Sequence, residues 1–135
     1  MIANIFMIAS VIAVLSIMII FKVQADKLKK NPDDIEKIQT RFFIGVAIAE
    51  LIPTAFIIYG YMNVEPVTEI SELFIPAFVI FLSMAVASFF IFLQSKESMH
   101  KEVKGLLTTF AFVGNAVAMA IPLISLIGLL LMLPK

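Results

Sequence analysis

The chain has 135 residues, of which 61% are hydrophobic, and its ten Lys and Arg residues balance ten Asp and Glu residues. Its mean hydropathy is +1.07, whereas soluble domains are only about half apolar, so lipid is the expected solvent. The lack of a basic excess argues against nucleic acid as a partner. The absence of cysteine excludes disulfide, thiolate and zinc-finger chemistry.

Four apolar runs follow one another along the chain, at 2–21, 42–62, 73–93 and 106–133. Each is long enough to cross a bilayer as a helix, which takes roughly 20 residues. The first run has no basic residue before it and is longer than a typical signal-peptide core, so we expect it to be a helix of the mature protein. The sequence therefore predicts an all-α integral membrane protein with four transmembrane helices and no separate soluble domain.

The loops between these runs differ in charge. Loops 22–41 and 94–105 contain nine of the ten basic residues, whereas the middle loop, 63–72, has three glutamates and no basic residue. Basic loops favour the cytoplasmic side. We therefore expect both termini and the middle loop outside, and the two basic loops inside, in what we interpret as a bacterial cytoplasmic membrane. Most loop charges, and His100, have a simpler interpretation as solvated loop residues.

Glu50 is the one ionisable residue inside a predicted span, in "RFFIGVAIAELIPTAFIIYGYM". Burying a charge at mid-membrane costs from roughly 3 to more than 10 kcal/mol, so the neutral acid is the favoured form. A carboxyl that exchanges its proton in lipid is suited to carrying protons. A neutral acid that only hydrogen-bonds a neighbouring helix fits the same residue, and both interpretations stay open.

Pro53 follows Glu50 by three residues and lacks a backbone N–H, so it leaves the carbonyl of Ala49 without its helical partner. That carbonyl could accept the proton of a neutral Glu50 or help to hold a hydrated proton. The alternative is an ordinary proline kink that neighbouring helices satisfy.

The second and fourth runs resemble one another. "TRFFIGVAIAELIPTAFII" aligns without gaps on "TFAFVGNAVAMAIPLISLI" at a constant shift of 69 residues, and Glu50 falls on Met119. The shared positions include Thr40 and Thr109, Phe43 and Phe112, Gly45 and Gly114, Ala47 and Ala116, Ala49 and Ala118, Ile52 and Ile121, and Pro53 and Pro122. Such a repeat predicts two tandem helical hairpins, 1–66 with the carboxylate and 67–135 as a degenerate copy.

These residues resemble the proteolipid, or c subunit, family of rotary F-type and V-type ATP synthases. That family has a polar loop of the form R-Q-P and a second helix of the form F-I-G-x-A-x-x-E-x-x-P. Here Lys30, Asn31 and Pro32 form the loop, and Phe43, Ile44, Gly45, Ala47, Glu50 and Pro53 follow with the family spacing. The resemblance covers the first hairpin well and the second as a diverged copy.

The resemblance implies a function and partners. Glu50 would carry the proton, Ala49, Pro53 and Gly45 would support it, and Lys30, Asn31 and Pro32 would contact a rotor stalk. Ile17 and Leu51 stand where sodium-binding members have oxygen ligands, so a proton is expected, without a metal or cofactor. The chain would be no enzyme by itself but a homo-oligomeric ring component in the lipid bilayer, with stator and stalk subunits of a rotary ATPase as partners.

A second hypothesis is a non-transporting membrane paralogue with an assembly, modulatory or structural role. The family's first helix has a glycine stripe, which lets helices pack closely, and Ser10, Ile12, Val14, Ser16 and Met18 stand there instead. The second loop also has Lys101 where the first has its proline. A small enzyme or a nucleic-acid-binding protein has no supporting group of residues.

Overall fold

A computed structural model describes residues 2–95 and 101–134, and every regular element in these residues is a helix. The predicted loop residue His100 lies outside them. The long helices are α1 (Ile2–Lys30), α2 (Ile35–Ala49), α3 (Leu51–Met62), α4 (Phe74–Ser95) and α5 (Lys101–Leu131), with short 3-10 helices η1 (Pro32–Asp34) and η2 (Ile70–Leu73) in the connections. The all-α class is therefore confirmed for the part of the chain that is described.

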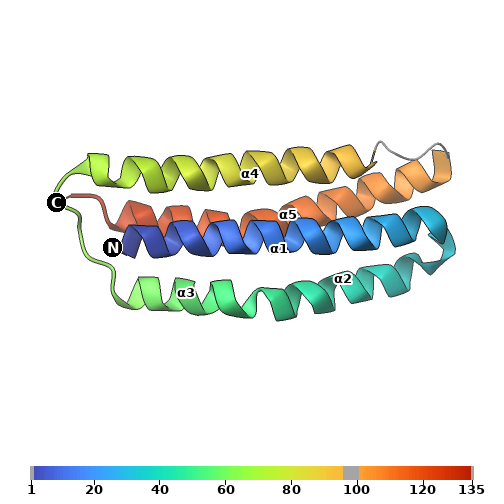
Figure 1. The fold of residues 1–135 in the computed structure, drawn as a ribbon, viewed down its shortest axis with the longest axis horizontal. Coiled ribbons are helices and arrows are strands. Elements are labelled where there is room, and N and C mark those ends of the chain that lie inside the picture. Colours follow the sequence, from blue (N-terminus) through green and yellow to red (C-terminus); the bar gives the residue numbers. More distant parts are fainter. Residues whose placement is uncertain (1, 96–100, 135) are drawn as a thin grey trace.

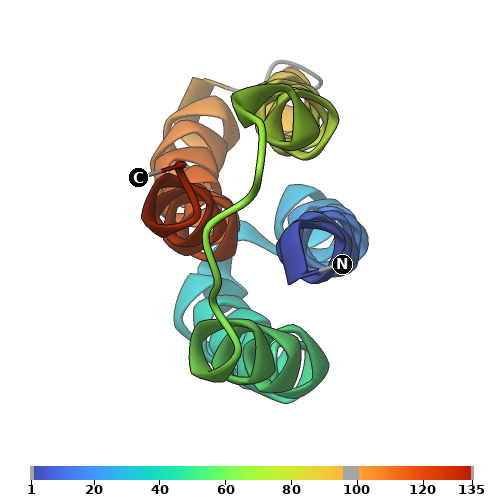
Figure 2. The same ribbon diagram turned by 90° about the vertical axis from the view of Figure 1, so that its left-hand side faces the viewer.

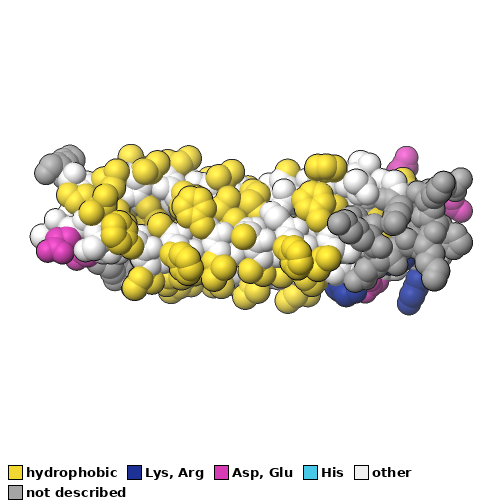
Figure 3. Space-filling view, turned by 90° about the horizontal axis from the view of Figure 1, so that it is seen from above, with side chains coloured by type: hydrophobic (Ala, Val, Ile, Leu, Met, Phe, Trp, Pro, Cys, Tyr) yellow, Lys and Arg dark blue, Asp and Glu magenta, His cyan; other side chains and the backbone are white. Residues whose placement is uncertain are grey.

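Among the described residues, three segments are long and apolar enough to cross a membrane: Ile2–Lys30, Ile70–Gln94 and Gly105–Leu131. The segments Pro32–Ala49 and Leu51–Met62 would make a fourth span only if they count as one, because a bend of 43° separates them. Figure 3 shows apolar side chains over the middle of the molecule and charged ones towards its two ends. This distribution is that of a membrane protein, with a belt of apolar surface between polar ends.

Helix α1 lies in the middle of the bundle. It packs against α5, α4 and the bent pair α2 and α3, whereas the bent pair packs mainly on α1 and only sparsely on α5. Figures 1 and 2 show this arrangement, with α4 and the bent pair on opposite sides of α1 and α5. The bent pair is therefore the least enclosed part of the bundle.

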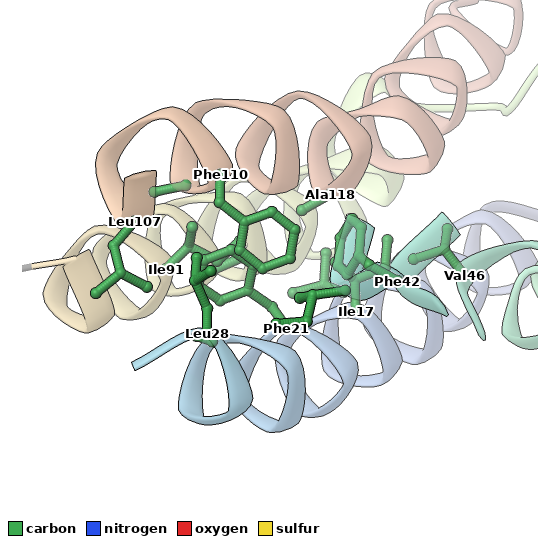
Figure 4. Close-up of a cluster of buried hydrophobic side chains, with 14 residues drawn as sticks. Ile17, Phe21, Leu28, Phe42, Val46, Ile91, Leu107, Phe110 and Ala118 are labelled. Carbon is green, nitrogen blue, oxygen red and sulfur yellow. The ribbon is translucent and has the colours of Figure 1, made fainter. Parts of the chain in front are cut away.

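Aromatic rings fill the half of the core nearer the end of the bundle where residues 22–41 carry most of the basic side chains (Figure 4). Phe21 of α1 stacks on Phe110 of α5 with ring centroids 4.9 Å apart, and Phe42 of α2 meets Phe110 edge to face at 5.1 Å. All three side chains are fully buried. Lipid tails are as apolar as these side chains, so close packing of this kind, rather than the hydrophobic effect, holds membrane helices together.

Glycines let α1 and α5 approach closely. A Cβ atom added at Gly114 would lie 2.7 Å from the ring of Phe21, and one added at Gly128 would lie 2.6 Å from the ring of Phe6. The same Phe6 ring lies against Gly60 of α3, where an added Cβ would approach to 2.8 Å. Two rings of α1 therefore occupy spaces that only glycine leaves open, and these contacts fix how the helices are aligned.

At both ends of the bundle, residues beyond the predicted spans belong to the packed structure. Helix α1 continues from the end of the apolar run to Lys30, because Gln24, Ala25 and Leu28 are buried within the bundle. The middle loop crosses the opposite end of the molecule (Figure 2). There the N–H of Val67 donates a 2.9 Å hydrogen bond to the carbonyl of Met132, which ties the loop to the end of α5.

Candidate functional site

The helix that carries the candidate carboxyl is interrupted at that residue. Helix α2 ends at Ala49, α3 begins at Leu51, and Glu50 lies in the turn between them. Backbone hydrogen bonds continue on both sides, since the N–H of Glu50 bonds Val46 at 2.8 Å and its carbonyl accepts from Thr54 at 2.9 Å. Pro53 is fully buried in the first turn of α3. Proline cannot donate to the carbonyl four residues earlier, so the carbonyl of Ala49 lacks its usual helical partner at this break.

The carboxyl of Glu50 is enclosed although the residue as a whole is only half-buried. Both of its oxygen atoms, Oε1 and Oε2, are inaccessible to solvent, and neither has a hydrogen-bond partner among the described residues. A charged carboxylate in such a place would lose its hydration without compensation, which is costly. The enclosure therefore favours the neutral acid over the charged carboxylate.

Tyr61 links the bent pair to a neighbouring helix. Eleven residues separate Glu50 from Tyr61, about three helical turns, so the two side chains leave nearly the same face of the bent pair. The Tyr61 hydroxyl donates a 2.6 Å hydrogen bond to the carbonyl of Ile124 on α5. Tyr61 therefore joins the bent pair to α5 about three turns away from the carboxyl.

The second copy of the motif behaves differently. Pro122 is also fully buried, yet α5 continues through it from Lys101 to Leu131. Met119, at the position that corresponds to Glu50, is half-buried and packs against the aromatic core. The two copies therefore share their buried proline, and the helix is interrupted only in the copy that carries the carboxyl.

The predicted supporting residues fall into two groups. Ala49 and Pro53 flank Glu50 at the break, and Gly45 lies a little more than one turn before it, where an added Cβ would lie 3.4 Å from Ile20 of α1. The predicted stalk-binding residues Lys30, Asn31 and Pro32 form the connection at the far end of α2. The structure therefore gathers the supporting residues at Glu50 and places the loop residues away from it.

Sequence patterns missed several buried or hydrogen-bonding polar residues of the bundle. Tyr61 is an ordinary aromatic residue in the sequence, and only its spacing from Glu50 could have indicated a shared face. Ser10 and Ser125 are fully buried, and neither hydroxyl has a partner in the described part of the chain. Within residues 2–95 and 101–134, no group of three or more His, Asp or Glu side chains could hold a metal ion.

Comparisons with known proteins add no relative. No family model, no curated protein and no solved structure matches the chain.

Proposed function

We propose that this chain is a proton-carrying membrane protein of the proteolipid type, a component of a homo-oligomeric ring in a rotary ATP synthase or ATPase. Glu50 takes up and releases one proton per chain. The main support for this proposal is the position of the Glu50 carboxyl, which is enclosed in an apolar span. Neither of its oxygen atoms has a hydrogen-bond partner among the described residues. Ionisable groups at such depth are expensive, and in membrane proteins they commonly serve ion and proton pathways.

The architecture that belongs to this proposal has four spans in two tandem hairpins, 1–66 and 67–135. Helices α2 and α3 act as one bent span, which pairs with α1 in the first hairpin. In the second hairpin, α4 pairs with α5. The buried prolines Pro53 and Pro122 at equivalent positions support it. With Met119 in place of the acid, each chain carries one proton for four helices. The loop with Lys30, Asn31 and Pro32 faces the cytoplasm, where a stalk subunit would bind it.

The break at Glu50 supports the role of this residue in exchange. Helix interruptions at membrane depth are tolerated where they are buried in protein or border water, and they leave backbone groups free to bind ions or protons. The carbonyl of Ala49, which Pro53 cannot satisfy, is the group available to a neutral Glu50. A small movement of α3 would change the surroundings of the carboxyl without unfolding either helix.

The test is proton uptake by membrane vesicles that contain the chain with its native membrane partners. Glu50→Gln retains the shape and hydrogen-bonding capacity of the side chain but cannot ionise, so proton uptake is abolished while the protein level in the membrane is unchanged. Glu65→Gln, which alters an exposed glutamate of the middle loop, is the matched control and keeps full activity. Unchanged uptake in Glu50→Gln would refute the proposal.

A second candidate function is a structural or assembly role, and one observation favours it. Helix α1 contributes the large rings of Phe6 and Phe21 to its contacts with α3 and α5, and the glycines that make room for these rings lie on α3 and α5. The glycine stripe that would let copies of the first helix pack on one another is therefore missing from α1 itself. A protein that stays monomeric in mild detergent, as native mass spectrometry can measure, would support this role over a ring.

A further inference from the structure

One face of α2 changes from basic to apolar along its length. Lys37, Arg41, Ile44 and Ile48 are spaced by four, three and four residues, so their side chains leave the same face of the helix. All four are exposed, Ile44 to 56% and Ile48 to 65%. We call this face the α2 track.

Hollows lie at both ends of the α2 track. The first, about 340 Å³, lies at its basic end and is lined by Glu36, Lys37, Thr40 and Arg41. The second, about 510 Å³, lies beyond the break at Glu50, between α3 and α1, and is lined by Ile5, Leu51, Ile52, Ala55, Phe56 and Tyr59. The exposed Ile44 and Ile48 connect the two, so the α2 track runs from a basic hollow into an apolar groove.

The charges at the basic end suit an anion. Lys37 and Arg41 are one turn apart, and neither forms an ion pair with the described residues. Glu36 is the one acidic side chain in the lining of the hollow, so two positive charges face one negative charge. Arginine and lysine at the end of a membrane helix reach the headgroup level of the bilayer, where phosphate groups are the abundant anions.

The distances also suit a lipid. Ten residues separate Arg41 from Leu51 at the start of the apolar groove, which is ~15 Å at the helical rise per residue. Half of a bilayer's hydrocarbon core is also about 15 Å thick. An acyl chain whose headgroup is held at Arg41 would therefore end at the groove.

We propose that the α2 track is a binding site for one anionic phospholipid. Its phosphate is held by Lys37 and Arg41, and one acyl chain lies over Ile44 and Ile48 with its end in the groove between α3 and α1. The lipid covers the outer side of the break at Glu50. A second copy of the chain would meet the same basic end with like charge, which disfavours it as the occupant.

The absence of tryptophan from the chain makes a direct test possible. Ile48→Trp places the only indole on the α2 track, and Leu82→Trp places one on the exposed surface of α4 as a reporter away from it. Each variant is reconstituted with mixtures of ordinary lipid and lipid brominated in the acyl chains. Quenching by brominated phosphatidylglycerol, which is anionic, is compared with quenching by brominated phosphatidylcholine, which is zwitterionic.

The Ile48→Trp reporter is expected to prefer the anionic lipid by about fivefold, the factor that corresponds to one net positive charge near the membrane surface. The Leu82→Trp reporter is expected to show no preference. Adding Lys37→Gln and Arg41→Gln removes the preference at position 48, whereas Lys27→Gln, which alters an exposed basic residue of α1, retains it. Equal quenching by the two lipids at position 48, or a preference that survives Lys37→Gln with Arg41→Gln, would overturn the site.

Discussion

Tyr61 on α3 donates a 2.6 Å hydrogen bond to the backbone carbonyl of Ile124 on α5, and this contact joins the bent pair to the helix that carries the second copy of its motif. The Tyr61 ring also meets Phe6 of α1 edge to face, with centroids 5.3 Å apart. One side chain thus touches both helices on which α3 rests. It lies at the end of α3 farther from the break at Glu50.

Tyr61→Phe is expected to destabilise the bundle by about 0.6 to 1.7 kcal/mol, the range found for hydrogen bonds between membrane helices. The change removes the hydroxyl and keeps the ring contact with Phe6. Tyr59→Phe is the matched control, because Tyr59 is exposed on another face of α3. Reversible unfolding in mixed detergent micelles measures both, and an equal effect of the two changes would contradict an interhelical role for Tyr61.

Gly128→Ala is expected to destabilise the protein by about 1 to 3 kcal/mol, the usual cost of overpacking a close-packed core. The added Cβ would lie 2.6 Å from the ring of Phe6, so α1 and α5 would have to move apart. Gly105→Ala is the control, since no atom lies within 4 Å of the position of its Cβ.

A second change separates crowding from helix propensity. Phe6→Leu makes the facing side chain smaller, so it should recover part of the stability lost in Gly128→Ala. If Gly128→Ala is harmless, or if Phe6→Leu only adds to the loss, the close approach of α1 and α5 at this point is wrong.

Topology can be measured with single cysteines, because the chain has none of its own. The loop charges predict Asn63 outside and Asn31 in the cytoplasm, and both residues are exposed in connections at opposite ends of α2 and α3. Asn63→Cys should react with a membrane-impermeant thiol reagent in intact cells, and Asn31→Cys only after the cells are opened. The reverse pattern would invert the orientation, and labelling of both from one side would exclude a span through the bent pair.

Three of the four apolar runs predicted single long helices, α1, α4 and α5, because the need to satisfy every backbone group in lipid leaves few alternatives to a helix. The run 42–62 was expected as one helix and is divided into α2 and α3. The ends of the helices were less predictable. Helix α1 extends through Gln24 to Lys30 because tertiary burial, which the local hydropathy does not register, stabilises this part of the helix.

The interruption at Glu50 was beyond local patterns. Pro53 and Pro122 lie in nearly the same sequence context, yet only the helix with Pro53 is divided. Packing differs around the two prolines, since α5 packs against both α1 and α4 whereas the bent pair rests mainly on α1. Glu50 could be singled out from the sequence because a lone carboxyl is conspicuous in an apolar run, but the contacts of Tyr61 become visible only when the helices are assembled.

Modification by a hydrophobic carbodiimide tests the role of Glu50 most directly, because this reagent needs a protonated carboxyl that can be reached from lipid. The protein is treated in native membranes, and the modified peptide is located by mass spectrometry. We predict that Glu50 is modified, that modification slows as the pH is raised, and that Glu50→Gln abolishes it while Glu65→Gln does not. Modification confined to the glutamates of the middle loop, with Glu50 unreacted at every pH, would contradict a proton-exchanging carboxyl within the membrane.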